Sequence, residues 1–341
     1  MTDRLSSDET NSLTGCGNRS AAGDPAGDCL GTLPLLAPLL AVVGPTASGK
    51  SELALFLASR FNGEIVNCDS LQIYRGFDIG TAKSIAPGVA HHLFDILDPT
   101  ELFTAGEYAR RANVVVTEIA MRGKTPVLVG GTGFYLRALL EGLSRAPERN
   151  DQLRERLERR KGARLHRLLQ RFDPAAAARI HRHDRPKLIR ALEVCVETRR
   201  PMSDVWAEGR RGLAGFSVVK LGLNPPRAAL YNRINERTRR MYQRGLLEEV
   251  RALLARGVPP DAKPFQAPGY TEALAVVRGT MTVEEAVDLT QRRTRQYAKR
   301  QTTWFRKERD LHLLQGFGDD ADVQQAALEQ MQPPINADER R

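Results

Sequence analysis

An eight-residue stretch, GPTASGKS at positions 44–51, has the residue types and the spacing of a phosphate-binding loop. Its two glycines would let backbone N–H groups close around phosphate oxygens at the start of a helix. Lys50 would add a positive charge, and the hydroxyl group of Ser51 could ligate Mg²⁺. Such a loop can serve nucleotide hydrolysis, phosphoryl transfer or the departure of a diphosphate, and its spacing does not choose among them. The residues predicted to bind the phosphates are Gly44, Pro45, Thr46, Ala47, Ser48, Gly49, Lys50 and Ser51.

The carboxylates near this loop narrow the chemistry. A P-loop enzyme that hydrolyses a nucleotide usually holds Mg²⁺ with an Asp from a second strand and positions a water molecule. The best candidate for that strand, TPVLVGG at 125–131, is followed by Thr132 and carries no acid. Asp69 follows the apolar EIVNC at 64–68 and is the only carboxylate at a predicted strand end. It could bridge a metal, cap a helix or act as a general base, and its position in the sequence does not separate these roles.

Apolar stretches alternate with helix-patterned stretches over much of the chain. Continuous apolar strands at 39–43, 64–68 and 125–131, and again at 216–223, are typical of a parallel sheet covered by helices on both faces. We therefore predict an α/β fold, a P-loop NTPase-like parallel sheet whose two parts span 35–144 and 213–312. Further helices are predicted from Arg227 to about Arg256 and from about Val283 to Arg309. Ligands of such sheets bind at the carboxyl ends of the strands, so the phosphate loop, Asp69 and Thr132 should converge on one site.

Three segments depart from this pattern. Residues 145–212 are rich in arginine, helix-patterned and interrupted by prolines, which predicts a helical insertion domain within the sheet-forming chain. Residues 1–34 contain few large apolar groups, so they cannot bury enough surface to offset the entropy of ordering, and a disordered tail is predicted. Residues 313–341 are predicted to be a flexible tail for the same reason.

The overall composition favours a polyanionic partner. The 51 basic residues exceed the 41 acidic ones and give a formal net charge of +10. The four cysteines, Cys16, Cys29, Cys68 and Cys195, lack the paired spacing of a disulfide framework or a zinc site, as expected in a reducing cytosol. The apolar stretch at 33–43 is too short to span a bilayer. We expect a cytoplasmic monomer that has no membrane partner.

Several longer motifs identify a family. Together with GPTASGKS they resemble the bacterial tRNA dimethylallyltransferases, and the resemblance runs from about residue 40 to about residue 310. The motifs are NCDSLQIYRGFDIGTAK (67–83), PVLVGGTGFYLRALLEGL (126–143), DPAAAARIHRHDRPKLIRALEV (173–194), LYNRINERTRRMYQRGLLEEV (230–250), GYTEAL (269–274) and AKRQTTWFR (298–306). A P-loop small-molecule kinase that uses ATP is the alternative, and it would share only the first motif. A non-catalytic RNA-binding protein is a third possibility.

The resemblance implies transfer of a dimethylallyl group from dimethylallyl diphosphate to N6 of the adenine 3′-adjacent to the anticodon of tRNA. The phosphate loop would then hold a diphosphate leaving group, with Mg²⁺ as the cofactor at Ser51. Asp69 would take the proton of the attacking amino group, and Thr132 and Arg237 would contact the diphosphate or the nucleotide. The chemistry also requires a channel in which the nucleotide and the diphosphate approach Asp69 from opposite sides.

The same resemblance implies contacts with the anticodon stem-loop of the tRNA. Arg292, Arg295, Lys299 and Arg306 would form a positive stripe on one face of the last predicted helix, suited to phosphates. In QAPGYT, Thr271 stands where the family has a basic residue and Pro268 replaces a small aliphatic one. The residues implied in RNA contact are Asp69, Ser70, Leu71, Gln72, Arg154, Pro186, Lys187, Leu188, Ile189, Arg190, Gln266, Ala267, Pro268, Gly269, Tyr270, Thr271, Lys299, Arg300, Gln301, Thr302, Thr303, Trp304, Phe305 and Arg306.

Overall fold

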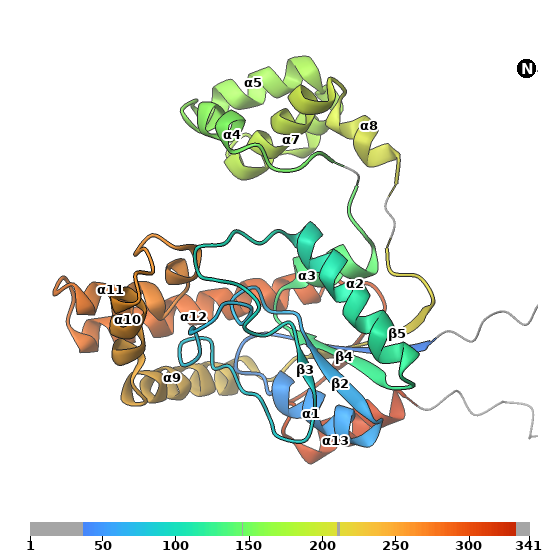
Figure 1. Ribbon diagram of the computed structural model, residues 1–341, viewed down its shortest axis with the longest axis vertical. Helices are drawn as coiled ribbons and strands as arrows, with labels where there is room; N and C mark the ends of the chain where they lie inside the picture. Colours follow the sequence, from blue (N-terminus) through green and yellow to red (C-terminus); the bar gives the residue numbers. More distant parts are fainter. Residues whose placement is uncertain (1–36, 145, 210–211, 332–341) are drawn as a thin grey trace, which may run out of the picture. The chain divides into compact units, whose positions relative to one another are not determined.

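A single parallel sheet organises the protein, whose computed structural model describes residues 37–144, 146–209 and 212–331. Six strands follow the order β3-β2-β4-β1-β5-β6, and every neighbouring pair among them is parallel (Figure 1). The strands are β1 (Ala37–Val43), β2 (Gly63–Asn67), β3 (His91–His92), β4 (Thr125–Gly130), β5 (Phe216–Leu223) and β6 (Leu311–Leu314). The predicted parallel sheet is confirmed.

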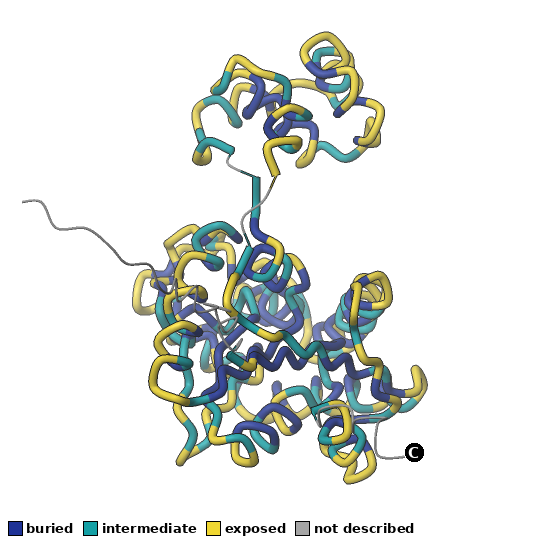
Figure 2. The backbone as a smooth tube through the Cα atoms, turned by 90° about the vertical axis from the view of Figure 1, so that its right-hand side faces the viewer, coloured by how far each residue is buried: buried dark blue, intermediate teal, exposed yellow. Residues whose placement is uncertain are grey.

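The central strands are buried on both faces, because their side chains alternate between two hydrophobic clusters. Leu39, Ala41 and Val43 of β1 belong to one cluster, and Leu40 and Val42 belong to the other. Strands β1 and β4 have the longest runs of buried residues in the sheet. The middle of the sheet is accordingly buried (Figure 2). Helices cover both faces, as predicted. On one side lie α1 (Lys50–Arg60) and α13 (Ala321–Glu329), and on the other α2 (Ala105–Met121) and α3 (Gly133–Leu140) (Figure 1).

The chain between β5 and β6 folds into five helical segments that pack beside the sheet. The single helix predicted from Arg227 to about Arg256 is wrong, because Gly245 adopts φ 97° and ends the first helix there. Thr282 and Glu285 form a capping box that begins the longest helix. The segments are α9 (Arg227–Gln243), α10 (Leu246–Ala255), the 3₁₀ helix η1 (Lys263–Gln266), α11 (Tyr270–Val277) and α12 (Val283–Phe305).

The arginine-rich insertion is helical, as predicted, over its described residues 146–209. Its prolines begin helices: Pro174 and Pro186 lie in first turns, and Pro201 is an N-cap. The insertion has its own hydrophobic cluster, which contains no residue of the sheet. Its helices are α4 (Asp151–Glu158), α5 (Gly162–Phe172), α6 (Pro174–Arg179), α7 (Arg185–Thr198) and α8 (Met202–Ala207).

The end of the chain corrects one prediction. Residues 313–331 are not a flexible tail, because Leu314 completes β6 and Val323 and Ala327 of α13 are buried against α1 and the sheet. The polar stretch between Leu314 and Val323 concealed this pattern of three buried positions. The predicted tail at 1–34, the last residues 332–341 and the cysteines Cys16 and Cys29 lie outside the described residues. None of the described helices is long and apolar enough to cross a membrane.

Candidate active site

The phosphate loop joins β1 to α1 and closes the carboxyl end of the sheet. Gly49 adopts φ 83°, and a Cβ atom there would lie 2.6 Å from the backbone nitrogen of Gly318, so both conformation and space require glycine. Lys50 folds back over the loop, and its Nζ donates to the carbonyl of Pro45 at 2.8 Å. Burial lowers the pKa of Lys50 to about 8, while the negative charge of Asp69 opposes the shift. A cation held in so little water is suited to an anionic ligand.

Asp69 is held by the turn that follows β2. The side chain of Asn67 accepts a hydrogen bond from the backbone N–H of Asp69 at 2.9 Å and donates to the carbonyl of Leu93 at 2.9 Å. Oδ1 of Asp69 accepts the backbone N–H of Leu71 at 2.9 Å. Among the described residues Oδ2 has no hydrogen-bond donor. One carboxylate oxygen thus fixes the orientation, and the other is available to a ligand.

Thr132 follows β4 and supports this turn. Its Oγ1 accepts the backbone N–H of Ser70 at 3.1 Å, directly beside Asp69. The convergence predicted for the phosphate loop, Asp69 and Thr132 is therefore found. Thr132 does not line the cavity itself, so it reaches the site through Ser70.

Arg237, from α9, links the two sides of the site. Its guanidinium donates to Oγ1 of Thr46 in the phosphate loop at 3.2 Å and to the carbonyl of Thr81 at 3.4 Å. Burial lowers the pKa of Arg237, and the charge of Asp69 opposes this effect. Arg237 therefore lies beside the phosphate loop and within electrostatic reach of Asp69, and its contact with the diphosphate or the nucleotide stays a prediction.

A cavity of about 130 Å³ brings these groups together. Its polar lining includes Lys50, Ser51, Asp69, Gln72 and Arg237, and apolar side chains complete the wall. The described residues contain no group of three or more His, Cys, Asp or Glu side chains that could hold a metal ion. The cavity thus brings two cations, a hydroxyl group and a carboxylate to one space.

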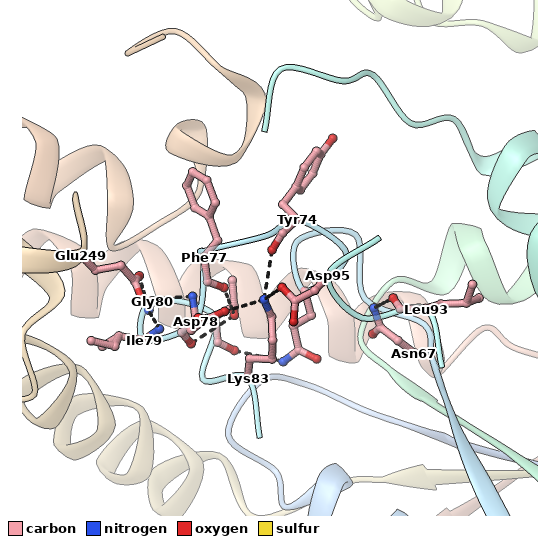
Figure 3. Close-up of polar contacts among 12 residues, drawn as sticks. Asn67, Tyr74, Phe77, Asp78, Ile79, Gly80, Lys83, Leu93, Asp95 and Glu249 are labelled. Atoms are coloured by element: carbon pink, nitrogen blue, oxygen red, sulfur yellow. Dashed lines mark hydrogen bonds and ion pairs between the residues drawn. The ribbon is translucent and has the colours of Figure 1, made fainter. Parts of the chain in front are cut away.

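Two further residues, which sequence reasoning missed, fix the loop that forms the far wall (Figure 3). Lys83, whose side chain is 5% exposed, forms ion pairs with Asp78 and Asp95 and donates to the carbonyl of Tyr74 at 3.0 Å. Glu249, from α10, accepts the backbone N–H groups of Asp78 and Ile79 at 3.1 and 2.7 Å. Both residues lie within motifs already quoted. Asp78 and Ile79 are 170 or more positions from Glu249, so their pairing leaves no local signal. The partners of Lys83 lie within 12 positions of it, but in a loop, where no repeating spacing marks them.

This loop supplies the carbonyl group at which several parts of the site meet. The carbonyl of Thr81 accepts Nε2 of Gln72 at 3.1 Å as well as Arg237. Tyr270, which is fully buried, donates to Glu249 at 2.5 Å and accepts the N–H of Gly80 at 3.1 Å. The segment 266–271 is therefore connected to the reactive centre through the loop that Glu249 holds.

A third connection runs from α12 to the phosphate loop. The amide of Gln301 accepts the backbone N–H of Thr46 at 2.8 Å and donates to the carbonyl of Gly131 at 2.9 Å. Both ends of this amide are therefore engaged, although sequence reasoning assigned Gln301 to RNA contact. On the outer side of the loop, the N–H of Gly318 donates to the carbonyl of Ser48 at 2.9 Å. Arg233 holds the neighbouring Asp319 with two hydrogen bonds, at 2.7 and 2.9 Å.

The residues predicted to contact RNA divide into exposed and buried sets. Pro186, Lys187, Gln266, Lys299, Arg300, Thr303, Trp304 and Arg306 are exposed. The side chains of Leu188, Ile189, Ala267, Tyr270 and Phe305 are buried, so they can position their neighbours but offer no side-chain surface to RNA.

Arg154 and Arg190, also predicted to contact RNA, are paired within the insertion. Arg154 donates twice to Glu193 at 2.8 Å, and Arg190 also bonds this carboxylate. Burial alone would raise the pKa of Glu193, but the two guanidinium groups lower it to about 2. These arginines therefore neutralise a buried charge.

Comparisons with known proteins agree with this architecture. A family model described as IPP transferase matches residues 72–308. A tRNA dimethylallyltransferase of Solibacter usitatus is 53% identical over 86% of this chain and 98% of its own length. One of Koribacter versatilis is 53% identical over 86% and 97%.

Solved structures show the same fold. A tRNA isopentenylpyrophosphate transferase of Bacillus halodurans is similar with a TM-score of 0.63 and 38% identity, over 86% of this chain and 97% of that one. A eukaryotic dimethylallyltransferase, captured acting on tRNA, is similar with a TM-score of 0.74 and 28% identity, over 85% and 77%.

Proposed function

Because this chain belongs to the IPP transferase family, we propose that it transfers a dimethylallyl group from dimethylallyl diphosphate to N6 of the adenine 3′-adjacent to the tRNA anticodon. The observation that carries the proposal is the single cavity in which Lys50 and Arg237 face the same space as Asp69. The full set of motifs is not expected of the kinase alternative, which shares only the phosphate loop.

The phosphate-loop side of the cavity stabilises the leaving group. As the allylic C–O bond breaks, its electron pair goes to the diphosphate and negative charge accumulates there. Backbone N–H groups of Gly44–Ser51, the ammonium group of Lys50 and the guanidinium of Arg237 are held where they meet that charge. Because these groups are fixed before the reaction, they stabilise the transition state without reorganisation.

The site suits a Mg²⁺ ion whose ligands come partly from the protein and partly from the substrate. Ser51 is exposed at the phosphate loop and lines the cavity. Mg²⁺ commonly binds through one or two protein ligands together with substrate phosphates and water, so one hydroxyl group beside the loop is sufficient. When bound, the ion would neutralise part of the charge on the departing diphosphate.

Asp69 acts on the nucleophile. The lone pair of the adenine N6 forms the new N–C bond while the C–O bond to diphosphate breaks. The nitrogen becomes acidic only as it gains positive charge, and its proton then passes to Oδ2 of Asp69. Oδ1 remains bonded to Leu71, so the carboxylate keeps its orientation during the transfer.

The tRNA is the acceptor that the names of the similar enzymes indicate. An adenine in the anticodon loop can be unstacked at modest cost and enter a cavity beside Asp69. The exposed cations Lys299, Arg300 and Arg306 on α12 are suited to the phosphates of the RNA. One chain contains the whole cavity, and we propose that the enzyme acts as a cytoplasmic monomer.

One assay tests the proposal directly. The protein is incubated with radiolabelled dimethylallyl diphosphate, Mg²⁺ and unmodified tRNA, without ATP, and label is expected in the RNA. Asp69→Asn should lower the single-turnover rate by about 10²-fold or more while tRNA affinity persists. Phosphate transfer from ATP to a small acceptor, with unlabelled RNA, would instead support the kinase. A rate unchanged by Asp69→Asn would remove the general-base role.

A further inference from the structure

A second cavity, of about 590 Å³, lies outside the reaction site. It is enclosed by the first turn of α9, the last turns of α12 and the segment between β6 and α13, and it shares no lining residue with the first cavity. The chemical steps proposed above use none of its lining, although Lys299 and Arg306 on its α12 side are among the cations suited to RNA phosphates. The cavity is several times larger than a single phosphate group requires.

The lining of this second cavity carries an excess of positive charge. Arg227, Lys299 and Arg306 all line it, and no carboxylate pairs with any of them among the described residues. The one carboxylate in the lining, Asp320, already accepts the backbone N–H of Phe317 at 2.8 Å. Unpaired cations around a concave surface favour an anionic ligand.

The beginning of α9 points to the same class of ligand. This helix of 17 residues follows Pro226, and no side chain caps its first turn. Arg227, Ala229 and Leu230 of that turn line the second cavity. N–H groups at such an uncapped end are ready to bind phosphate oxygens.

The floor of the second cavity is apolar. Pro225 and Leu230 are buried there, and Phe317 and Tyr231 contribute aromatic rings. One face of each ring is covered by an arginine, Arg233 over Phe317 at 3.7 Å and Arg227 over Tyr231 at 5.1 Å from the ring centroid, so a base would use the remaining apolar surface. Asn224 and Gln315 also line the cavity. Nδ2 of Asn224 donates to Oε1 of Gln315 at 3.0 Å, so Oδ1 of Asn224 and Nε2 of Gln315 are the amide groups left for the edge of a base. A ligand that fills this space combines an anionic group with a flat apolar one.

We propose that the second cavity binds one nucleotide, with its phosphate between the start of α9 and the cations of α12 and its base on the apolar floor. The nucleotide could be one unpaired nucleotide of the tRNA or a free nucleoside phosphate. The first source rests on the proposed function. The chemistry of the ligand is the same in both cases. Its source is decided by experiment.

Photolabelling tests the site with a defined probe. Radiolabelled 8-azidoadenosine 5′-monophosphate is added to the full-length protein together with Mg²⁺ and saturating inorganic diphosphate, which occupies the phosphate loop. Label is expected in the peptides that contain residues 224–231 or 299–317. Arg227→Glu should weaken labelling by about tenfold, because one charge-assisted contact becomes repulsive. Arg239→Glu, an equal charge change at an exposed position of α9 outside the lining, should leave labelling unchanged.

A second variant and a competitor complete the test. Gln315→Trp places a large ring at the rim from an exposed position and should also abolish labelling. Anticodon stem-loop RNA that suppresses labelling would identify tRNA as the source, and RNA that binds without suppressing it would identify a free nucleotide. Label absent from these peptides, or unaffected by both variants, would overturn the proposal. Prenylation of tRNA is measured in the same preparations, so failure of this site and failure of the proposed function are distinguished.

Discussion

The two sides of the reaction cavity are built in different ways. The phosphate side comes from one continuous stretch, Gly44–Ser51, in which neighbours in sequence are neighbours in space. The opposite side needs Asp69 and the loop at 77–84, which Glu249 of α10 holds from a distant part of the chain. Arg237 of α9 joins the phosphate loop to Thr81 of that opposite loop, and Gln301 of α12 joins it to Gly131. Only the first construction leaves a recognisable spacing in the sequence. The contrast predicts that substitutions on the two sides will change different kinetic quantities.

The largest effect is expected on the phosphate side. Lys50→Ala removes the cation that meets the departing diphosphate, and the loss of such a preorganised group costs about 10³-fold in kcat/KM. Steady-state kinetics with dimethylallyl diphosphate varied would measure it, and the Kd for tRNA should change little. A variant that lost tRNA affinity while retaining kcat would contradict the division between the two sides.

A smaller effect is expected on the opposite side, through positioning. Glu249→Gln replaces an acceptor of several donors by an amide whose NH₂ group cannot accept, so the loop carrying Thr81 should shift. A displacement of about 1 Å at the reacting groups can cost about 10²-fold, and we expect it in the single-turnover rate. The Kd values of both substrates should change far less.

Tyr270→Phe is the matched control for Glu249. It removes one hydroxyl donor to the same carboxylate but leaves the bonds to Asp78 and Ile79 intact. The rate should fall by about threefold to tenfold, since only the two hydrogen bonds of this hydroxyl group, to Glu249 and from Gly80, are lost. Equal rates for Glu249→Gln and Tyr270→Phe would show that the backbone contacts of Glu249 do not position the loop.

The same contrast explains how far the sequence predicted the structure. Apolar runs located β1, β2, β4 and β5, and the phosphate loop and Asp69 followed from local spacing. The contacts of Glu249 with Ile79 and of Gln301 with Gly131 were missed because each joins residues 170 positions apart. Strand β3 has two residues, too few for any period to show.

The roles of the basic residues could also be predicted only in part. Arginines in the insertion and on α12 look alike in sequence, and both groups were predicted to contact RNA. In the structure Arg154 and Arg190 neutralise the buried Glu193, whereas Lys299 and Arg306 have no carboxylate partner among the described residues. Whether a basic side chain is free to bind RNA depends on its neighbours in the folded structure, so a count of basic residues does not predict it.

The outer support of the phosphate loop offers a milder test. Arg233→Ala removes the ion pair that holds Asp319 beside Gly318, whose N–H bonds the loop at Ser48. The pair is partly exposed, and we expect the KM for dimethylallyl diphosphate to rise about fivefold, with the KM for tRNA unchanged. Arg239→Ala, on the exposed face of the same helix, is the control. A rise in the KM for tRNA alone would show that Arg233 supports the side of the reaction cavity opposite the phosphate loop.

The smallest effect concerns pH and depends on the same lysine. Because burial lowers the pKa of Lys50 to about 8, the ligand-free enzyme carries the charged form below that pH and loses it above. Affinity for dimethylallyl diphosphate should therefore be highest below pH 8 and fall as pH rises, by about fourfold between pH 7 and 8.5 for one titrating group. Calorimetric titration would detect both the weaker binding and the uptake of a proton by the enzyme at the higher pH. In Lys50→Arg the guanidinium stays charged throughout this range. The pH dependence of affinity that comes from the enzyme should therefore vanish, and only the part that comes from ionisation of the ligand should remain. An identical pH profile for both proteins would show that Lys50 is already charged at pH 8.5, and that the charges around it outweigh its burial.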